Sequence, residues 1–524
     1  MPRRTLLGLS AGAGIALAAG LTGPRILHHG GRGTGELLRS RTPLPEPFQQ
    51  PLTTPRVLQP IRTTGDTDYY RIVQRESAAE IIPGVRTPIW GYEGTFPGPT
   101  IESRKDRTTV VHHRNELPVP TVVHLHGGHT PADSDGYPTD LLTPAAGWDA
   151  DHAGHGDHAG GMHDDRARIA HGERDYRYPP QQRAATLWYH DHRMDFTGPA
   201  VYRGLVGFHL IRDDEEDALD LPSGERELPL MIADRAFDEH GAFAYPSLDP
   251  TLRTTPGVQD AYVEGVFGDV ILVNGAPWPV HEVAAARYRL RVLNASNARR
   301  YDLTLDPPPP GGAGFVQIGS DQGLLDAPRR HDHLPIAPAE RYDLIVDFSR
   351  YPVGTRVTVR NRLGAGPTAL VMQFVVTRRE YDPSRIPRKL SDLPRLTREQ
   401  ATTVREFSFH SGPVHGHAGW LIGGKPFSPD HMAATPRLGD VEIWRFAADV
   451  HHPVHLHLVG FQVLTRHGRP PGPYDAGHKD TVDLRPAEAV EVITRFHGYR
   501  GRYVFHCHNA EHEDMAMMAN FEVI

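Results

Sequence analysis

The stretch HCHNAEHEDMAMM, residues 506–518, holds the only cysteine of this 524-residue chain. Cys507 lies directly between His506 and His508. The preceding residues GRYVF are typical of a β-strand, on which successive side chains point to opposite faces. The sulfur of Cys507 should therefore face away from the two flanking imidazoles. This alternation predicts two different sites, one on each side of a single strand.

More potential ligands are expected on the face that carries the sulfur. The spacing Cys-x4-His-x4-Met continues from Cys507 to His512 and Met517. His452 should join them, because it lies three residues before the next His-x-His pair and so points away from it. Two histidines, a cysteine and a weak axial methionine are the ligands of a blue-copper electron-transfer site. Two neighbouring methionines are alternatives for the thioether, Met515 and Met518. A buried, inert thiol is the alternative for the cysteine.

His-x-His pairs recur on segments that are typical of strands. Residues i and i+2 of a strand share a face about 6.6–6.8 Å apart, so each pair offers two imidazoles to one metal site. Eight neutral nitrogens suit three borderline-to-soft metal ions. The four pairs are His124/His126, His190/His192, His455/His457 and His506/His508.

Composition and hydropathy predict an all-β fold. The 52 glycines and 48 prolines indicate many turns, and 39% hydrophobic residues suffice for a packed core. Strand-like segments recur with the rhythm of β-sandwiches in three blocks, residues 50–212, 226–380 and 403–524. An acidic run at 213–217 and a charged segment at 380–402 are expected to be linkers. The expected strands are TVVHLHGG (121–128), LWYHDH (187–192), DVILVNG (269–275), RYRLRVLN (287–294), YDLIVDF (342–348), VEIWRF (441–446), HLHLVGFQVL (455–464) and GRYVFHCH (501–508).

Charge and hydropathy exclude some classes of function. The net charge of −8 has both signs interspersed, which argues against a nucleic-acid-binding surface. Past the N-terminus, no stretch approaches 18 uncharged apolar residues, so a polytopic membrane protein is excluded. Arg3 and Arg4 precede a Gly/Ala-rich apolar stretch that resembles a twin-arginine export signal, with a single membrane anchor as the alternative. Residues 1–49 are therefore predicted to be a signal and disordered leader of an extracellular or cell-envelope protein, with no stable membrane span after processing.

Residues 149–165, DADHAGHGDHAGGMHDD, contain four histidines in a polar context that cannot form a core. We expect a surface loop in the first block. A tolerated polar insertion is the favoured interpretation, and auxiliary copper capture is the alternative. Further histidines are not expected to be ligands. The adjacent residues His112 and His113 are predicted to lie on the surface. The pair His415/His417 is expected in a loop, and the pair His331/His333 lies between charged residues and a proline.

These motifs together resemble three-domain multicopper oxidases of the spore-coat laccase, bilirubin oxidase and phenoxazinone synthase group. The resemblance spans about residue 50 to the C-terminus, and the His-rich insertion is the main departure. The matching segments are HLHGG (124–128), YHDH (189–192), HPVHLH (452–457), HCHNAEHEDMAMM (506–518), FPGPTIE (96–102), LVNG (272–275), RVLNAS (291–296), SDQGLLDAP (320–328) and APAERYDLIVDFS (337–349).

The resemblance implies three cupredoxin-like Greek-key domains and four copper ions, one of type 1, one of type 2 and a type 3 pair. It also implies ligand roles. Type 1 ligands would be His452, Cys507, His512 and Met517, and type 2 ligands His124 and His455. The type 3 pair would be held by His126, His190, His192, His457, His506 and His508. Glu513 and Asp135 match acidic residues near the oxygen path and are predicted to relay protons.

The expected activity is laccase-like: one-electron oxidation of phenolic or aminophenolic donors, coupled to four-electron reduction of O2 to water. Its partners would be O2 and a small aromatic reducing substrate, docked beside the type 1 histidine nearest the surface, His512. Oxidation of bilirubin, o-aminophenol or cuprous ion is an alternative, as is a non-catalytic copper-buffering protein. A copper-free scaffold protein is disfavoured, because all twelve ligand positions carry ligand-type residues.

Overall fold

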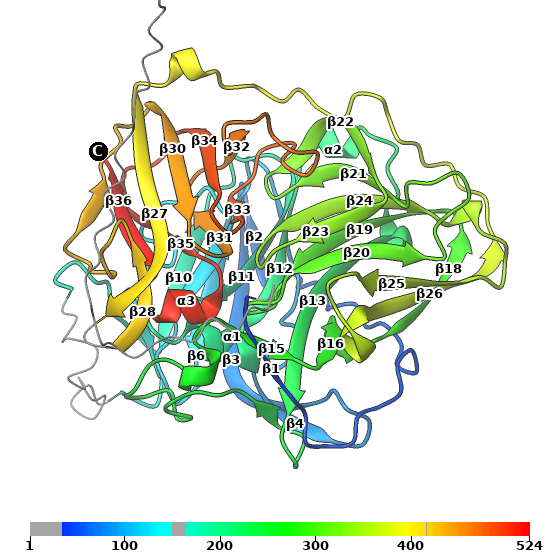
Figure 1. The fold of residues 1–524 in the computed structure, drawn as a ribbon, viewed down its shortest axis with the longest axis horizontal. Helices are drawn as coiled ribbons and strands as arrows, with labels where there is room; N and C mark the ends of the chain where they lie inside the picture. The colour runs from blue at the N-terminus through cyan, green and yellow to red at the C-terminus, as the bar shows by residue number, and fades with distance from the viewer. Residues whose placement is uncertain (1–33, 149–163, 415–416) are drawn as a thin grey trace, which may run out of the picture. The chain divides into compact units, whose positions relative to one another are not determined.

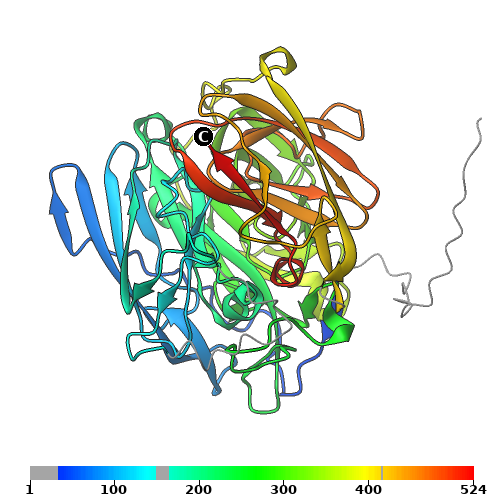
Figure 2. The same ribbon diagram turned by 90° about the vertical axis from the view of Figure 1, so that its left-hand side faces the viewer.

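The computed structural model describes residues 34–148, 164–414 and 417–524. The predicted export signal and most of the His-rich insertion lie outside these residues. The described chain is built from three successive pairs of β-sheets (Figures 1 and 2). The all-β prediction is confirmed. Each expected strand segment contains strand residues, because its β-branched and aromatic side chains pack into a sandwich.

The first sheet pair carries two of the His-x-His motifs. A buried apolar cluster that draws on both sheets forms its core. One sheet contains β2 (Arg62–Thr64), β3 (Thr67–Glu80), β4 (Arg86–Tyr92), β6 (Thr108–Asn115) and β10 (Glu173–Tyr178). The other contains β5 (Ile101–Arg104), β7 (Val123–His126), β11 (Ala185–Asp191) and β12 (Val206–Arg212). Beside them lie β8 (Leu142–Thr143), β9 (Ala170–His171) and α1 (Thr197–Arg203).

The second sheet pair has the largest apolar cluster. Its first sheet contains β13 (Glu227–Phe237), β14 (Phe243–Ala244), β16 (Val270–Val273), β17 (Ala276–Pro277), β19 (Arg287–Asn294), β21 (Phe315–Ser320), β22 (Gly323–His331) and β24 (Arg341–Asp347). Its second contains β18 (Val280–Ala285), β20 (Tyr301–Asp306), β23 (His333–Ile336), β25 (Arg356–Asn361) and β26 (Leu370–Arg379).

The third sheet pair carries the other two His-x-His motifs. Its aromatic-rich core includes Cys507 and Met517. One sheet contains β27 (Thr403–Val414), β28 (His417–Ile422), β30 (Val441–Ala448), β32 (Phe461–Arg466) and β34 (Ala489–Arg495). The other contains β29 (Met432–Ala434), β31 (His452–Leu456), β33 (Thr481–Leu484), β35 (Gly501–Cys507) and β36 (Met518–Val523), with helix α3 (Ala510–Asp514) between its last two strands.

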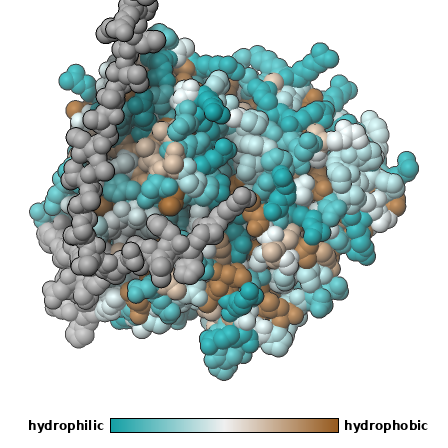
Figure 3. Space-filling view, viewed as in Figure 1, coloured by the Kyte–Doolittle hydropathy of each residue, from teal (hydrophilic) through white to brown (hydrophobic). Residues whose placement is uncertain are grey.

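Helices are short throughout the described chain, and none of them is long and apolar enough to span a membrane. The face seen in Figure 3 is mostly hydrophilic, with hydrophobic residues in small groups. The remaining helical turns are of the 3-10 type: η1 (Gly224–Arg226), η2 (Asp260–Tyr262), η3 (Phe348–Arg350), η4 (Gly366–Ala369) and η5 (Arg398–Gln400).

The N-terminal leader is not disordered as far as residue 49. Residues Glu36–Leu38 form strand β1, which pairs in parallel with β15 (Val266–Gly268). The prediction was wrong here because the partner strand lies about 230 residues further along the chain, so no local pattern reveals it.

Three predictions about polar residues were also wrong. The acidic run is not a solvated linker: helix α2 (Asp214–Asp217) forms there, and Glu216 is buried. His113 is not a surface residue, since it is buried between the rings of Tyr92 and Tyr176. The segment that follows residue 416 is not a loop, because strand β28 begins at residue 417 and pairs with β27.

Candidate metal centres

The four His-x-His pairs lie at the ends of two pairs of neighbouring antiparallel strands, and in three of them the second histidine is one residue past the strand. On β7 and β11, His124 is opposite His190. On β31 and β35, His455 is opposite His506. The two strand pairs come from different sheet pairs yet meet, and the ring of His457 stacks on that of His124 with 3.8 Å between centroids. All eight imidazoles are buried: His124, His126, His190, His192, His455, His457, His506 and His508.

Three of these imidazoles form a three-nitrogen group. The Nε2 atoms of His192 and His457 each lie 3.2 Å from Nε2 of His506. Nδ1 of His506 lies 3.1 Å from the carbonyl oxygen of Cys507, and Nδ1 of His457 lies 2.8 Å from the Asp135 carboxylate. An imidazole that donates from one nitrogen presents the other as a metal ligand. This group can therefore hold a metal ion through three Nε2 atoms.

Two further imidazoles form a two-nitrogen group. Nε2 of His124 lies 3.4 Å from Nε2 of His455. Nδ1 of His124 donates to the backbone carbonyl of Asp135 at 2.5 Å, and Nδ1 of His455 donates to that of Asp480 at 2.9 Å. The two backbone carbonyls therefore direct both Nε2 atoms toward one point.

The remaining three imidazoles leave buried nitrogens unused. His126 Nδ1, His190 Nε2 and His508 Nε2 have no hydrogen-bond partner within the described part of the chain. The ring of His508 lies 4.9 Å from that of His126 and 5.3 Å from that of His190, between centroids. A buried nitrogen without a partner is costly, and a metal ion would satisfy all three. The ligand nitrogens of His126 and His190 lie within metal-binding distance of each other and of His124, and the ring of His508 lies beside them.

Burial favours the neutral form of five of these imidazoles. Burial lowers the pKa of His190 to about 3 and that of His192 to about 4, and it lowers the pKa of His124, His455 and His508 well below the usual range. A protonated imidazole cannot bind a metal ion. These five imidazoles are therefore neutral, and able to bind a metal ion, throughout the physiological pH range.

A separate group lies on the other face of β35. The sulfur of Cys507 lies 3.5 Å from Nδ1 of both His452 and His512, and these two nitrogens are 3.1 Å apart. Met517 is fully buried in the same cluster, and its carbonyl accepts a hydrogen bond from the backbone N–H of Cys507 at 3.1 Å. Burial raises the pKa of the Cys507 thiol, so a metal ion would have to displace its proton. The alternation along β35 thus sends sulfur and flanking imidazoles to opposite sides, as predicted.

The outer edges of both rings in the sulfur group are covered. Nε2 of His452 lies 2.9 Å from the Asp449 carboxylate, and Nε2 of His512 donates to the carbonyl of Glu264 at 3.2 Å. Trp420 stacks on His512 with 3.7 Å between ring centroids. His512 is only 1% exposed, so its ring is almost completely closed off from direct contact with solvent.

Both predicted acidic residues lie beside the histidine clusters. Glu513 Oε2 is 3.1 Å from Nδ1 of His506, and its Oε1 accepts a hydrogen bond from the Thr197 hydroxyl at 2.7 Å. Asp135 binds Nδ1 of His457 through its carboxylate, as described above. The position of Asp135 behind a ring also suits it to orient that ring.

Sequence reasoning missed the polar residues that orient the rings. Asp449 and Asp480 hydrogen-bond to cluster imidazoles, and Trp420 stacks on one. Asp449 is only three residues from His452, so its position was a usable signal. Asp480 lies just before β33 and Trp420 lies on β28, each more than 20 residues from the imidazole that it contacts, and no local pattern links them to the site.

Comparison with known proteins agrees with this geometry. Two family models, both described as multicopper oxidase, match residues 386–524 and residues 74–153 with 157–216. A laccase from Bacillus subtilis (strain 168) is 36% identical, over 91% of this chain and 98% of that protein. The chain belongs to the multicopper oxidase family. The buried clusters of this oxidase are consistent with type 1, type 2 and type 3 copper sites.

Other relatives of this multicopper oxidase span nearly the whole chain. A bilirubin oxidase from Albifimbria verrucaria is 34% identical over 90% of this chain and 81% of that protein. Among solved structures, a laccase from Pediococcus acidilactici superposes with a TM-score of 0.78 at 29% identity, covering 93% of this chain and 96% of that one. The McoA multicopper oxidase from Aquifex aeolicus superposes with a TM-score of 0.74 at 29% identity, covering 90% and 99%. The fold is therefore that of three-domain cupredoxin oxidases.

Proposed function

We propose that this multicopper oxidase takes electrons singly from phenolic or aminophenolic aromatic donors and uses four of them to reduce O2 to water. The observation that carries the proposal is the His506-Cys507-His508 tripeptide, whose sulfur faces one buried ligand group and whose imidazoles face the others. Such an arrangement separates electron entry from oxygen reduction. Relatives named laccase and bilirubin oxidase support the choice of aromatic donors.

We assign the ligands from the nitrogen and sulfur atoms that converge. The sulfur group of His452, Cys507 and His512 would hold type 1 copper. Met517, buried in the same apolar cluster, would be its axial ligand, as expected from the sequence. The two-nitrogen group, His124 and His455, would hold type 2 copper. The two three-nitrogen groups would hold the type 3 pair, one with His192, His457 and His506 and the other with His126, His190 and His508.

Copper supplies the one-electron redox chemistry when it is bound. The protein's own residues position the metal ligands, keep bulk water away from them and transfer protons. The backbone from Cys507 to His506 gives a short covalent path between the two sides of β35. Glu513 holds its carboxylate beside His506 and His192, so it can accept a proton and pass it on at the oxygen-reducing side. The main chain of Glu264 and the ring of Trp420 keep water and large donors off His512.

The test measures oxygen uptake by the copper-loaded protein with phenols, aminophenols, bilirubin and cuprous ion as separate donors. We expect a blue protein that consumes O2 with phenols and aminophenols. Cys507→Ser should lose the intense blue colour and all donor-dependent uptake, because no other sulfur replaces the thiolate. A colourless wild-type protein at full copper content, or a Cys507→Ser variant that still oxidises donors, would refute the assignment. Copper binding without uptake from any donor would favour the copper-buffering alternative.

A further inference from the structure

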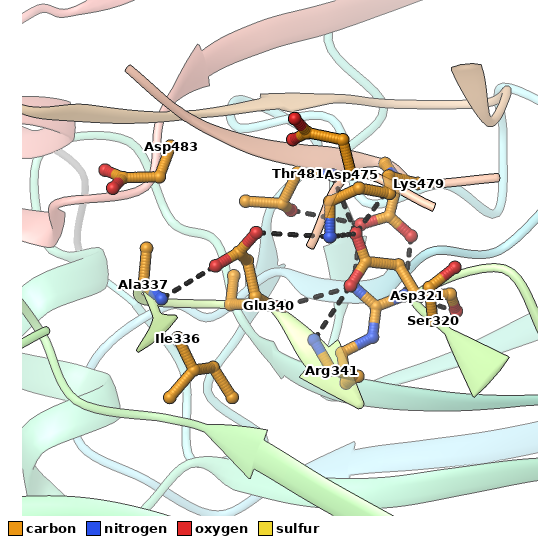
Figure 4. A network of polar contacts seen from close by, with 12 residues as sticks. Ser320, Asp321, Ile336, Ala337, Glu340, Arg341, Asp475, Lys479, Thr481 and Asp483 are labelled. Carbon is orange, nitrogen blue, oxygen red and sulfur yellow. Dashed lines mark hydrogen bonds and ion pairs between the residues drawn. The ribbon is translucent and has the colours of Figure 1, made fainter. Parts of the chain in front are cut away.

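A buried cluster of five charged residues lies directly behind the imidazoles of His126 and His455. Figure 4 shows Lys479 between Asp321 and Glu340, with Arg341 beside them. Nζ of Lys479 lies 3.1 Å from both carboxylates. All five are buried: Asp321, Glu340, Arg341, Lys479 and Asp480. Three carboxylates and two cations leave one net negative charge, which suits a neighbouring metal cation.

Asp480 is the member of this cluster that touches candidate ligands. Its carboxylate Oδ1 lies 3.1 Å from Nε2 of His126, and its backbone carbonyl accepts the Nδ1 hydrogen bond of His455. The carboxylate is held by both guanidinium nitrogens of Arg341, at 2.5 and 2.6 Å, and by the Gln322 amide at 2.6 Å. One residue therefore engages opposite nitrogens of two imidazoles.

We propose that Asp480, clamped by Arg341, is a positioning residue that decides which nitrogen each of these imidazoles offers to copper. His126 donates a hydrogen bond from Nε2–H to the Asp480 carboxylate, so Nδ1 faces the metal. This matches its Nδ1 being buried without a hydrogen-bond partner among the described residues. His455 donates a hydrogen bond from Nδ1–H to the Asp480 carbonyl, so Nε2 faces the metal. The inference rests on the ligand assignment proposed above.

The clamp also gives the second sheet pair a role in the copper cluster. Arg341 begins β24, and Asp321 and Gln322 lie in the turn between β21 and β22. Asp321 accepts hydrogen bonds from the backbone N–H groups of Arg341 and Asp480, at 2.8 and 3.2 Å. Since no candidate ligand assigned above lies on this sheet pair, its contribution is to fix Asp480 from behind. A bidentate guanidinium pair fixes a carboxylate in one plane, which Lys cannot do.

The experiment compares copper-loaded wild type with Asp480→Ala, Arg341→Lys and Arg341→Met. We expect about 10–100-fold weaker copper binding at the type 2 and type 3 sites, an altered type 2 electron paramagnetic resonance signal, and an unchanged blue type 1 band. Arg289→Met is the matched control: Arg289 is equally buried and paired with Asp343 and Glu216, but it touches no candidate ligand. It should lower the melting temperature and leave copper content and resonance signal normal.

If the three variants behave like Arg289→Met, with lower melting temperature and normal copper spectra, the proposal is overturned. Should a variant fail to fold, 15N-histidine NMR of the reduced, diamagnetic wild-type holoenzyme decides. We expect His126 to carry its proton on Nε2 and His455 on Nδ1, and the reverse tautomer at His126 overturns the proposal. A wild-type protein without a blue band or a full complement of copper would instead contradict the proposed function, so the two failures are distinguishable.

Discussion

At the residue scale, the chemistry depends on which atom each side chain leaves free. The histidine clusters are buried, and backbone carbonyls or carboxylates occupy one nitrogen of several rings, as for His124, His455 and His457. Each such hydrogen bond fixes a tautomer and a ring orientation, and strengthens the ligand. The imidazoles are therefore set in place before copper arrives, which reduces the cost of assembling the sites.

The carboxylate of Glu513 gives a prediction at this scale. We expect Glu513→Gln to slow oxygen reduction by about 10²–10⁴-fold while the blue colour remains, because the amide preserves the hydrogen bond with Thr197 but cannot accept a proton and pass it on. Reoxidation of the fully reduced protein by O2, followed by stopped-flow absorbance, measures this step.

Glu511→Gln is the matched control, since Glu511 lies buried on the same helix and binds Tyr245 and Asn297 instead of an imidazole. It should reoxidise at close to the wild-type rate. A normal rate in Glu513→Gln would remove this residue from the oxygen-reducing step.

At the element scale, helix α2 shows how tertiary contacts override local pattern. Its sequence DEED is fully acidic, yet Glu216 points into the protein and pairs with Arg289 at 2.8 Å and Arg291 at 3.0 Å. Both arginines lie on β19 of the second sheet pair, so the helix joins the first two sheet pairs through buried charge. Asp213 caps the helix by accepting the backbone N–H of Glu216.

We expect Glu216→Gln to destabilise the protein by about 3–5 kcal/mol, because it leaves two buried guanidinium groups short of their counter-charge. Asp217→Asn in the same helix is the control, since its ion pair with Arg104 is exposed and is worth about 0–1 kcal/mol. Denaturant unfolding of both variants provides the comparison. Equal stability of the two would show that burial of Glu216 contributes nothing.

At the scale of the whole molecule, distant parts of the chain meet at one cluster. The first sheet pair supplies His124, His126, His190 and His192, and the third supplies the other four cluster histidines, more than 260 residues away. The second sheet pair supplies charged groups behind them, such as Arg341. A bound metal ion would therefore join the first and third sheet pairs directly.

Copper removal tests this link. A ligand that binds only the folded state at 1,000 times its dissociation constant stabilises it by about 4 kcal/mol. We expect chelation to abolish the blue colour and oxygen uptake and to lower the melting temperature, and readdition of copper to restore all three. Calorimetry at matched pH makes the measurement. An identical melting temperature for the apo and copper-loaded forms would show that the ions do not tie the sheet pairs together.

Acid should destabilise the molecule through the buried ion pairs between the first two sheet pairs. Although burial alone would raise it, the guanidinium groups of Arg291, Arg289 and Arg212 lower the pKa of Glu227 from 4.5 to about 2. The folded state thus binds this proton less readily than the unfolded state does. Its stabilisation, on the order of 3 kcal/mol, is present above pH 4.5 and is lost as the pH falls toward 2. Unfolding of the apoprotein by denaturant between pH 6 and pH 2 checks the slope, and Glu227→Gln should flatten it.

The sequence alone determined the ligand types, the strand faces on which they lie and the β-sandwich class. These follow from short-range rules, above all the alternation of side chains that separates Cys507 from His506 and His508. Only the tertiary structure decided which ring nitrogens converge, which nitrogen of His126 is left without a hydrogen-bond partner among the described residues, and that Glu216 and Asp480 are buried against arginines. Those outcomes depend on contacts between residues that lie tens to hundreds of positions apart, and neither hydropathy nor spacing along the chain encodes such contacts.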